Sequence, residues 1–273
     1  MQQPEFTTLS LTLADHIAEV RLNRPDKSNA INEAMWQEIR QAFEWIDATP
    51  EARVVILSGA GKNFCAGIDL AMLAGVQQRI AHADGARSRE ALRRLILDLQ
   101  DCLSSLERCA KPVIAAIQGA CVGGALDLVT CCDLRYASAD ATFSVKEIDI
   151  GMVADVGTLQ RLPRLIGEGQ ARELAYTGRT LNGQEAEKLG LANRLFATPE
   201  ELEAGVRQIA RSIAAKSPLA IRGTKEVLNY SRDHSIADGL NFVATWNAAM
   251  LLSGDLKECM QAQMEKRAPQ FAD

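Results

Sequence analysis

Hydrophobic and polar residues alternate over the first part of the chain, and this pattern predicts a β-hairpin. Residues 6–13 and 16–22 follow the two-residue period of a strand and are rich in β-branched side chains. From Asn32 onward, apolar residues recur every three or four positions, which is the spacing of one face of a helix. Because Asn32 is also a favourable N-cap, a helix is predicted over residues 32–49.

Short apolar runs and longer amphipathic segments then follow one another. Residues 54–58 and 113–117 are almost wholly apolar and predict strands buried on both faces. Between them, residues 90–107 predict a long amphipathic helix, whereas the polar stretch 75–90 is interpreted as a mobile loop or a frayed helix. A short helix that begins on Gly123 and another strand come next. This order predicts an α/β protein, although strands separated by so few residues fit a doubly wound sheet poorly.

Beyond residue 155 the pattern is almost wholly helical. The candidate helices cover residues 157–165, 168–177, 183–189, 199–215, 218–230, 236–252 and 255–266. A Thr198–Pro199 break follows a strand-like pair, and it divides the prediction into two parts. These are a core at residues 1–198 and a helical C-terminal region at residues 199–273.

Composition and net charge indicate which kinds of binding partner are expected. The chain has 273 residues, 47% of them hydrophobic and 24% charged, as in an ordinary globular protein. Its net charge of −5 argues against a nucleic acid or an anionic membrane as partner. No apolar run reaches the roughly 20 residues of a membrane span, and neither end carries a recognisable targeting signal. A cytoplasmic location is therefore expected.

Cysteine and histidine usage gives no sign of a metal centre. The seven cysteines are odd in number, lack CxxC spacing and mostly have apolar neighbours, which predicts reduced and buried thiols. The three histidines, His16, His82 and His234, are far apart. Neither GxGxxG nor GxSxG occurs, and the turn at residues 59–62 does not match a phosphate-binding loop.

Three acids within residues 118–157 are the strongest candidates for chemistry. Asp127, Glu147 and Asp155 each lie beside apolar or small residues, and such surroundings should raise carboxyl pKa values towards the range useful for proton transfer. Structural roles compete with this interpretation. Asp127 could serve the dipole of its own helix, Glu147 could pair with a nearby Lys or Arg, and Asp155 could cap the helix near residue 157.

Two turns of small residues complete the candidate site. Residues 65–67 and 123–124 each follow a buried strand, and their glycines allow the main chain to approach a ligand closely. A pair of N–H groups from such turns can hold an oxygen that becomes negative during reaction, and the helix beginning at Gly123 adds its dipole. The alternative is that the glycines serve only tight packing of helix on strand.

With these residues in view, the chain is similar to the enoyl-CoA hydratase/isomerase (crotonase) family over nearly its whole length. The resemblance is carried by AGIDL at 66–70, KPVIAAIQGACVGGALDL at 111–128, CDLRYA at 132–137, VKEIDIG at 145–151 and LQRLPRLIG at 159–167. It implies an α/β spiral of ββα units followed by an all-helical trimerisation region. Trimers of this kind usually pair as hexamers. The implied substrate is a CoA thioester, and no cofactor is implied.

The resemblance also implies how the substrate is held. The N–H groups of Ala66 and Gly124 would form the oxyanion hole for the thioester carbonyl. Loops at residues 23–30 and 66–70 would hold the adenosine and phosphate parts of CoA. The implied substrate-binding residues are Lys27, Ala30, Ala66, Gly67, Ile68, Asp69, Leu70 and Gly124.

Within the family, the acids decide the reaction. Hydratases carry Glu at the positions of Asp127 and Glu147 and Gly at that of Asp155. With its added Asp155, together with RDHS at 232–235 and WN at 246–247, the chain resembles the branch that isomerises 3,5-dienoyl-CoA to 2,4-dienoyl-CoA in fatty-acid β-oxidation. Glu147 would then remove the C2 proton, Asp155 would deliver one at C6, and Asp127 would give electrostatic support. The alternatives are a 2-enoyl-CoA hydratase, a Δ3,Δ2-enoyl-CoA isomerase and a non-catalytic acyl-CoA-binding homologue.

Overall fold

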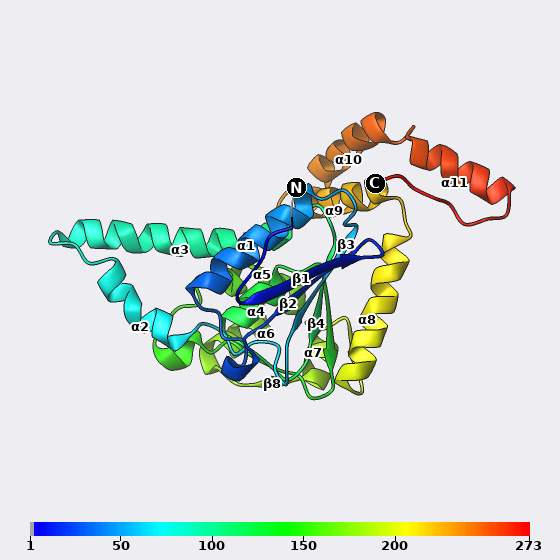
Figure 1. Cartoon of the computed structure of the whole chain (residues 1–273). Helices are drawn as coiled ribbons and strands as arrows, with labels where there is room; N and C mark the ends of the chain where they lie inside the picture. Colours follow the sequence, from blue (N-terminus) through cyan, green and yellow to red (C-terminus); the bar gives the residue numbers. More distant parts are fainter. Residues whose placement is uncertain (1–2) are drawn as a thin grey trace.

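A six-stranded sheet forms the centre of the molecule, whose computed structural model describes residues 3–273 (Figure 1). Across the sheet the strands are β1 (Leu9–Ala14), β2 (Ile17–Leu22), β3 (Val54–Gly59), β4 (Val113–Ile117), β6 (Leu134–Ser138) and β9 (Arg194–Phe196). The predicted hairpin is confirmed, because β1 and β2 pair antiparallel with Leu11 opposite Val20. The other neighbours pair parallel.

A second, three-stranded sheet explains the closely spaced strands. It consists of β5 (Ala120–Val122), β7 (Thr142–Ser144) and β8 (Leu181–Asn182). The chain passes from β4 to β5 and from β6 to β7, and thus from the large sheet to the small one, before each following helix. The fold is the predicted α/β spiral of ββα units. The strands of the small sheet are two or three residues long, which is too short to show a two-residue period, so the hydrophobic pattern did not predict them.

Helices cover both faces of the large sheet. The main core lies on the face of α1 (Glu33–Ala48), α3 (Gly85–Arg108), α4 (Gly124–Thr130) and α5 (Thr158–Ile166), with α6 (Glu168–Thr177) and α7 (Gly183–Leu189) beside them. The opposite face is covered by α8 (Pro199–Ala214), whose Leu202, Val206 and Ala210 pack on strand residues such as Ile56 and Ile114. The predicted N-cap of α1 is confirmed, since the Asn32 side chain accepts from Met35 N–H at 3.0 Å.

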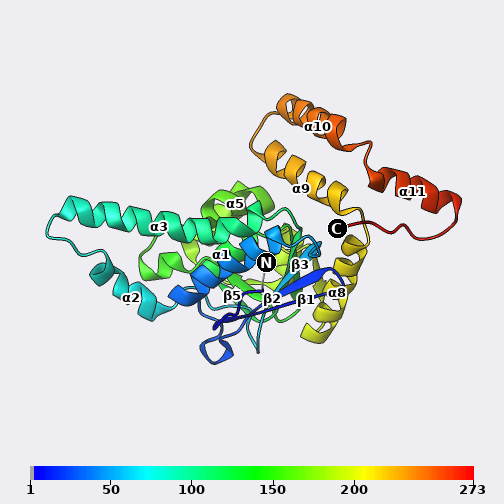
Figure 2. The ribbon, with the colours of Figure 1, turned by 45° about the horizontal axis from the view of Figure 1, so that its top comes forward.

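The segment predicted as a mobile loop or frayed helix is mostly helical. Residues 75–79 belong to α2 (Leu70–Arg79) and residues 85–90 belong to α3, so only a short turn separates two helices. Asp69 and Asp84 cap them by accepting from Ala71 and Ala86 N–H groups. No side chain of α2 is fully buried, and the α2–α3 hairpin projects from the body of the molecule (Figures 1 and 2). Residues 75–90 are mostly polar because they belong to an exposed pair of helices and not to a loop.

The last three helices also project from the core (Figure 2). They are α9 (Pro218–Arg232), α10 (Ile236–Met250) and α11 (Gly254–Met264). The predicted boundary at residue 198 places α8 in the same region, but α8 is packed on the sheet. The buried Lys225 ties α9 to the core through an ion pair of 2.8 Å with Asp133. Between residues 3 and 273 no helix combines the length and apolar character of a membrane span.

The cysteines are as predicted. All seven are free thiols, and six of them are buried.

Candidate active site

Two main-chain turns meet at the edge of the small sheet. Cys65 N–H donates to Ala120 O at 2.9 Å, and Val122 N–H donates to Cys65 O at 3.2 Å, so the segments that follow run side by side. Gly67 has a φ of +91°, and a Cβ added there would lie 2.5 Å from Val122 O and 3.4 Å from Gly124 N. Only glycine allows this approach. The two turns predicted to hold a ligand oxygen are therefore in direct contact.

The main-chain nitrogens of Gly124 and Ile68 lie close to each other at this contact. Gly124 is the first residue of α4, where helical N–H groups have no partner within the helix. A Cβ on Gly124 would lie 3.6 Å from Ile68 N. Among residues 3–273, neither N–H group donates a hydrogen bond. This pair has the form of an oxyanion hole, with the dipole of a short helix behind it.

Ala66, by contrast, is not placed as expected. Its N–H group donates to Ser28 O at 2.9 Å and is thus engaged in holding the neighbouring loop. The Gly67 N–H group donates to Cys65 Sγ at 3.4 Å, so the next N–H group of this turn that makes no hydrogen bond among the described residues is that of Ile68. We therefore assign the oxyanion pair to Ile68 and Gly124 rather than to Ala66 and Gly124.

Glu147 lies directly beside this pair. It is the first residue of the 3-10 helix η2 (Glu147–Ile150), and a Cβ on Gly123 would lie 3.1 Å from its Oε1. Its Oε2 is buried without a hydrogen-bond partner among the described residues. Among the described residues Glu147 also forms no ion pair, which was the alternative role. The neighbouring Lys146 pairs instead with Asp149, at 2.8 Å between Nζ and Oδ2. Burial, with the charges of Asp127 and Asp155, raises the pKa of Glu147 to about 7.

Asp127 is fully buried in α4 and caps another helix. Its Oδ1 accepts from Thr158 N–H at 2.5 Å, where α5 begins after a glycine that has no side chain to cap it. The cap that the sequence analysis considered for Asp155 is thus supplied by Asp127. Oδ2 has no partner among residues 3–273. Burial and the charge of Asp155 raise the pKa of Asp127 to about 6, although hydrogen bonds from Thr158 oppose this shift.

Asp155 lies in the loop between η2 and α5. The residues on either side of it, Ala154 and Val156, are buried, whereas the Asp155 side chain is half-buried. Its main-chain carbonyl accepts from Gln100 Nε2 of α3 at 2.6 Å. Burial raises the pKa of Asp155 as well.

The structure thus brings the three predicted acids together, although 28 positions separate the first from the last in the sequence (155 − 127 = 28). The charge of Asp155 raises the pKa of both other carboxyls, and the charge of Asp127 raises that of Glu147. With pKa values of about 6 and about 7, Asp127 and Glu147 titrate close to neutral pH, so the site can hold both a base and an acid there.

The two loops predicted to hold CoA are joined to each other. Arg24 forms an ion pair of 3.0 Å with Asp69 and also donates to Ala30 O at 2.5 Å. Asp69 therefore has two structural partners, Arg24 and the start of α2, and the Arg24 hydrogen bond lowers its pKa. Lys27 and Leu70 are exposed at the rim, with 66% of Leu70 accessible.

Asn29 is a supporting residue that the sequence analysis missed. It is fully buried, and its Nδ2 lies 2.9–3.0 Å from the carbonyl oxygens of Ala60, Asn63 and Phe64. Its φ of +55° lies in the left-handed region, where asparagine is more tolerated than most residues. It fixes the loop that carries Lys27 and Ser28 against the turn that leads to Gly67. An Asn within a polar loop gave no sign of this role.

Comparison with known proteins identifies the family. The family model described as enoyl-CoA hydratase/isomerase matches residues 12–273. This chain belongs to the enoyl-CoA hydratase/isomerase family. Within it, the chain is 51% identical over 252 residues to the protein from Arabidopsis thaliana named peroxisomal Delta(3,5)-Delta(2,4)-dienoyl-CoA isomerase, with 92% of this chain and 91% of that one covered.

Two further family members show the range of the similarity. The human protein named mitochondrial Delta(3,5)-Delta(2,4)-dienoyl-CoA isomerase is 46% identical, with 96% of this chain and 80% of that one covered. The crystal structure of an enoyl-CoA hydratase from Bacillus anthracis superposes with a TM-score of 0.87 at 33% identity and covers 97% of this chain and 99% of that one. The fold is therefore the crotonase fold predicted from the sequence.

Proposed function

We propose that this chain is an isomerase that converts 3,5-dienoyl-CoA to 2,4-dienoyl-CoA in fatty-acid β-oxidation. The observation that carries the proposal is Asp155, a second half-buried carboxyl with a raised pKa whose charge reaches Glu147. A shift of two conjugated double bonds needs one group at C2 and another at C6, and two separate carboxyls meet that need. The family members of 51% and 46% identity that bear this activity in their names support it.

The reaction would begin at the oxyanion pair. The thioester oxygen accepts hydrogen bonds from the N–H groups of Gly124 and Ile68, and Glu147 takes a proton from C2. The C2–H electron pair moves into a trienolate spread from the oxygen to C6, whose negative charge the two N–H groups stabilise. Asp155, protonated, then gives its proton to C6, and the double bonds settle at C2–C3 and C4–C5. Solvent returns Glu147 and Asp155 to their starting protonation states.

Asp127 supports this chemistry without touching the acyl chain. Its buried charge helps to hold the pKa of Glu147 at about 7, where the carboxyl is a stronger base than an ordinary glutamate. Its hydrogen bond to Thr158 fixes the end of the loop that carries Asp155. We therefore assign it a supporting electrostatic and positioning role.

The surface between the two catalytic carboxyls suits an acyl chain. Ile148, Ile150 and Val153 are exposed apolar side chains on the segment that joins Glu147 to Asp155, and 72% of Val153 is accessible. Exposed apolar surface of this kind commonly marks a binding groove. The CoA part would lie along the joined loops at residues 23–30 and 66–70. Neither cofactor nor metal takes part in the proposed steps.

Self-association as a trimer, or as a pair of trimers, remains a prediction, as does the functional boundary at residue 198. The projecting C-terminal helices support self-association because they expose large apolar side chains, among them Leu228, Ile236, Leu240, Leu252 and Met264. The expected cytoplasmic location also stays a prediction. The two named isomerases are described as peroxisomal and mitochondrial.

The second candidate is a 2-enoyl-CoA hydratase, which the structural likeness to the Bacillus anthracis enzyme favours. Incubation with a 3,5-dienoyl-CoA separates the candidates, because the 2,4-dienoyl product absorbs through its extended conjugation. We expect this absorbance to appear, and Asp155→Asn should abolish it while CoA-ester binding persists. Rapid hydration of a 2-enoyl-CoA with no diene signal would refute the proposal. A chain that binds the ester and alters neither substrate would be a non-catalytic homologue.

A further inference from the structure

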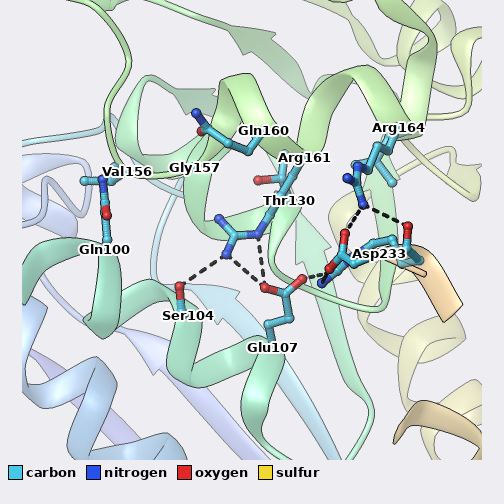
Figure 3. Close-up of a pocket in the computed structure, with 12 residues that line it drawn as sticks. Gln100, Ser104, Glu107, Thr130, Val156, Gly157, Gln160, Arg161, Arg164 and Asp233 are labelled. Atoms are coloured by element: carbon cyan, nitrogen blue, oxygen red, sulfur yellow. Dashed lines mark hydrogen bonds and ion pairs between the residues drawn. The ribbon is translucent and has the colours of Figure 1, made fainter. Parts of the chain in front are cut away.

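A polar cavity of about 400 Å³ lies behind the loop that carries Asp155 (Figure 3). It opens to solvent and is lined by residues of α3, α5 and the end of α9, and Val156 and Gly157 of the loop form part of its wall. Gln100 reaches the loop from the α3 side, while Gln160 of α5 lies on the opposite wall (Figure 3). The cavity therefore borders the loop directly after Asp155.

Gln100 makes a direct contact with Asp155. Its Nε2 donates to the main-chain carbonyl of Asp155 at 2.6 Å. Two other hydrogen bonds hold the loop at its ends, from Met152 N–H to Glu147 O at 2.9 Å and from Thr158 N–H to Asp127 Oδ1 at 2.5 Å. The Gln100 contact lies between them, at Asp155 itself.

The helix that supplies Gln100 is firmly fixed at this point. Cys102 and Leu103, which follow on α3, are completely buried. Asp98, two positions before Gln100, forms an ion pair of 2.8 Å with Arg40 of α1. The projecting part of α3 lies further towards its N-terminus. Gln100 thus connects an irregular loop to a rigid helix.

We propose that Gln100 is a positioning residue that holds Asp155 at the distance from Glu147 that the C2-to-C6 proton shift needs. The proposal rests on the isomerase function proposed above. Gln100 itself lines the cavity, which is large enough for water, so water replaces the donor that a substitution of Gln100 removes and global stability changes little. Water does not tie the loop to α3, however, and small misplacements of a catalytic group have large effects on rate.

The test compares Gln100→Met with Gln160→Met. The two changes remove the same amide from two walls of one cavity, but Gln160 makes no side-chain hydrogen bond within residues 3–273. For Gln100→Met we expect kcat on a 3,5-dienoyl-CoA to fall about tenfold, with KM within about twofold of wild type. Gln160→Met should match wild type in both constants. Thermal unfolding should show both variants folded.

A second reaction separates positioning of Asp155 from general damage. Deuterium exchange at C2 of a saturated acyl-CoA needs the oxyanion pair and Glu147, but it involves no proton transfer at C6. This exchange should stay within about twofold of wild type in Gln100→Met. Equal losses in exchange and isomerisation would overturn the proposal, and so would an unchanged kcat for isomerisation.

Gln100→Glu gives an independent variant of nearly the same size, which cannot donate when ionised. It should show the same selective loss, and wild-type kcat in this variant would overturn the proposal even if Gln100→Met failed to fold. Failure of the proposed function would look different, because wild-type protein itself would then form no 2,4-dienoyl-CoA.

Discussion

Asp127→Asn tests whether a buried carboxyl is kept in the site at a cost to stability. The pKa of Asp127 is about 6 in the folded protein, compared with 3.8 for an ordinary aspartate, chiefly because the side chain is buried. The folded state therefore holds the proton more tightly than the unfolded state. By linkage, the stability associated with this group is complete below pH 3.8 and is lost as the pH rises through about 6.

The size of the effect follows from the two pKa values. Their difference of about 2.2 units corresponds to about 3 kcal/mol, at 1.36 kcal/mol per unit. Asparagine keeps an oxygen that can accept from Thr158 N–H, so the cap of α5 survives the exchange. The buried amide nitrogen adds a cost that does not vary with pH. The difference in unfolding free energy between variant and wild type should therefore shift by about 2.5 kcal/mol in favour of the variant between about pH 4 and about pH 8, because an unfolded aspartate is already more than half ionised at pH 4.

Urea unfolding at a fixed protein concentration measures this difference at the two pH values. Asp26→Asn is the matched control, because Asp26 is exposed and its exchange removes no buried charge. The control should differ from wild type by the same small amount at both pH values. If the difference in unfolding free energy between Asp127→Asn and wild type is also the same at both pH values, the claim that the folded protein raises the pKa of this carboxyl is refuted.

Three further outcomes are expected. Gly67→Ala should reduce isomerase kcat by more than tenfold, since its Cβ would lie 2.5 Å from a main-chain oxygen, whereas Gly169→Ala, with open space around it, should be silent in the same assay. In a pH–rate profile, kcat/KM should rise with the ionisation of Glu147 near pH 7, and Asp127→Asn should move that rise to lower pH. An unchanged position of the rise would show that the charge of Asp127 does not raise the pKa of Glu147. Glu107→Gln should lower the melting temperature, because Glu107 pairs with arginines from both α5 and α9, and an unchanged melting temperature would show that these ion pairs add no stability.

The sequence was most informative where chemistry leaves a pattern in side chains. The α/β spiral, the helical C-terminal region and the two glycine turns follow from hydrophobic spacing and from family motifs. Asp127, Glu147 and Asp155 stood out because charged residues rarely lie in apolar stretches without a reason. The structure places all three in one site and couples their pKa values.

Details that depend on main-chain direction could not be predicted in the same way. Ala66 and Ile68 occupy one short turn, and only the path of the chain shows that Ala66 N–H is engaged by Ser28 while the Ile68 nitrogen lies close to Gly124. Long-range capping was equally hidden, since nothing in the sequence links Asp127 to the start of α5. Gln100 looked like one more polar residue on an amphipathic helix, because its partner is a main-chain carbonyl 55 positions away.

The position of the incoming proton tests the central claim most directly. When a 3,5-dienoyl-CoA is isomerised in D2O, the product should be a 2,4-dienoyl-CoA that carries one solvent deuteron at C6, and Asp155→Asn should not form it. Deuterium at C4, or a 3-hydroxyacyl product, would contradict the assignment of Glu147 to C2 and of Asp155 to C6.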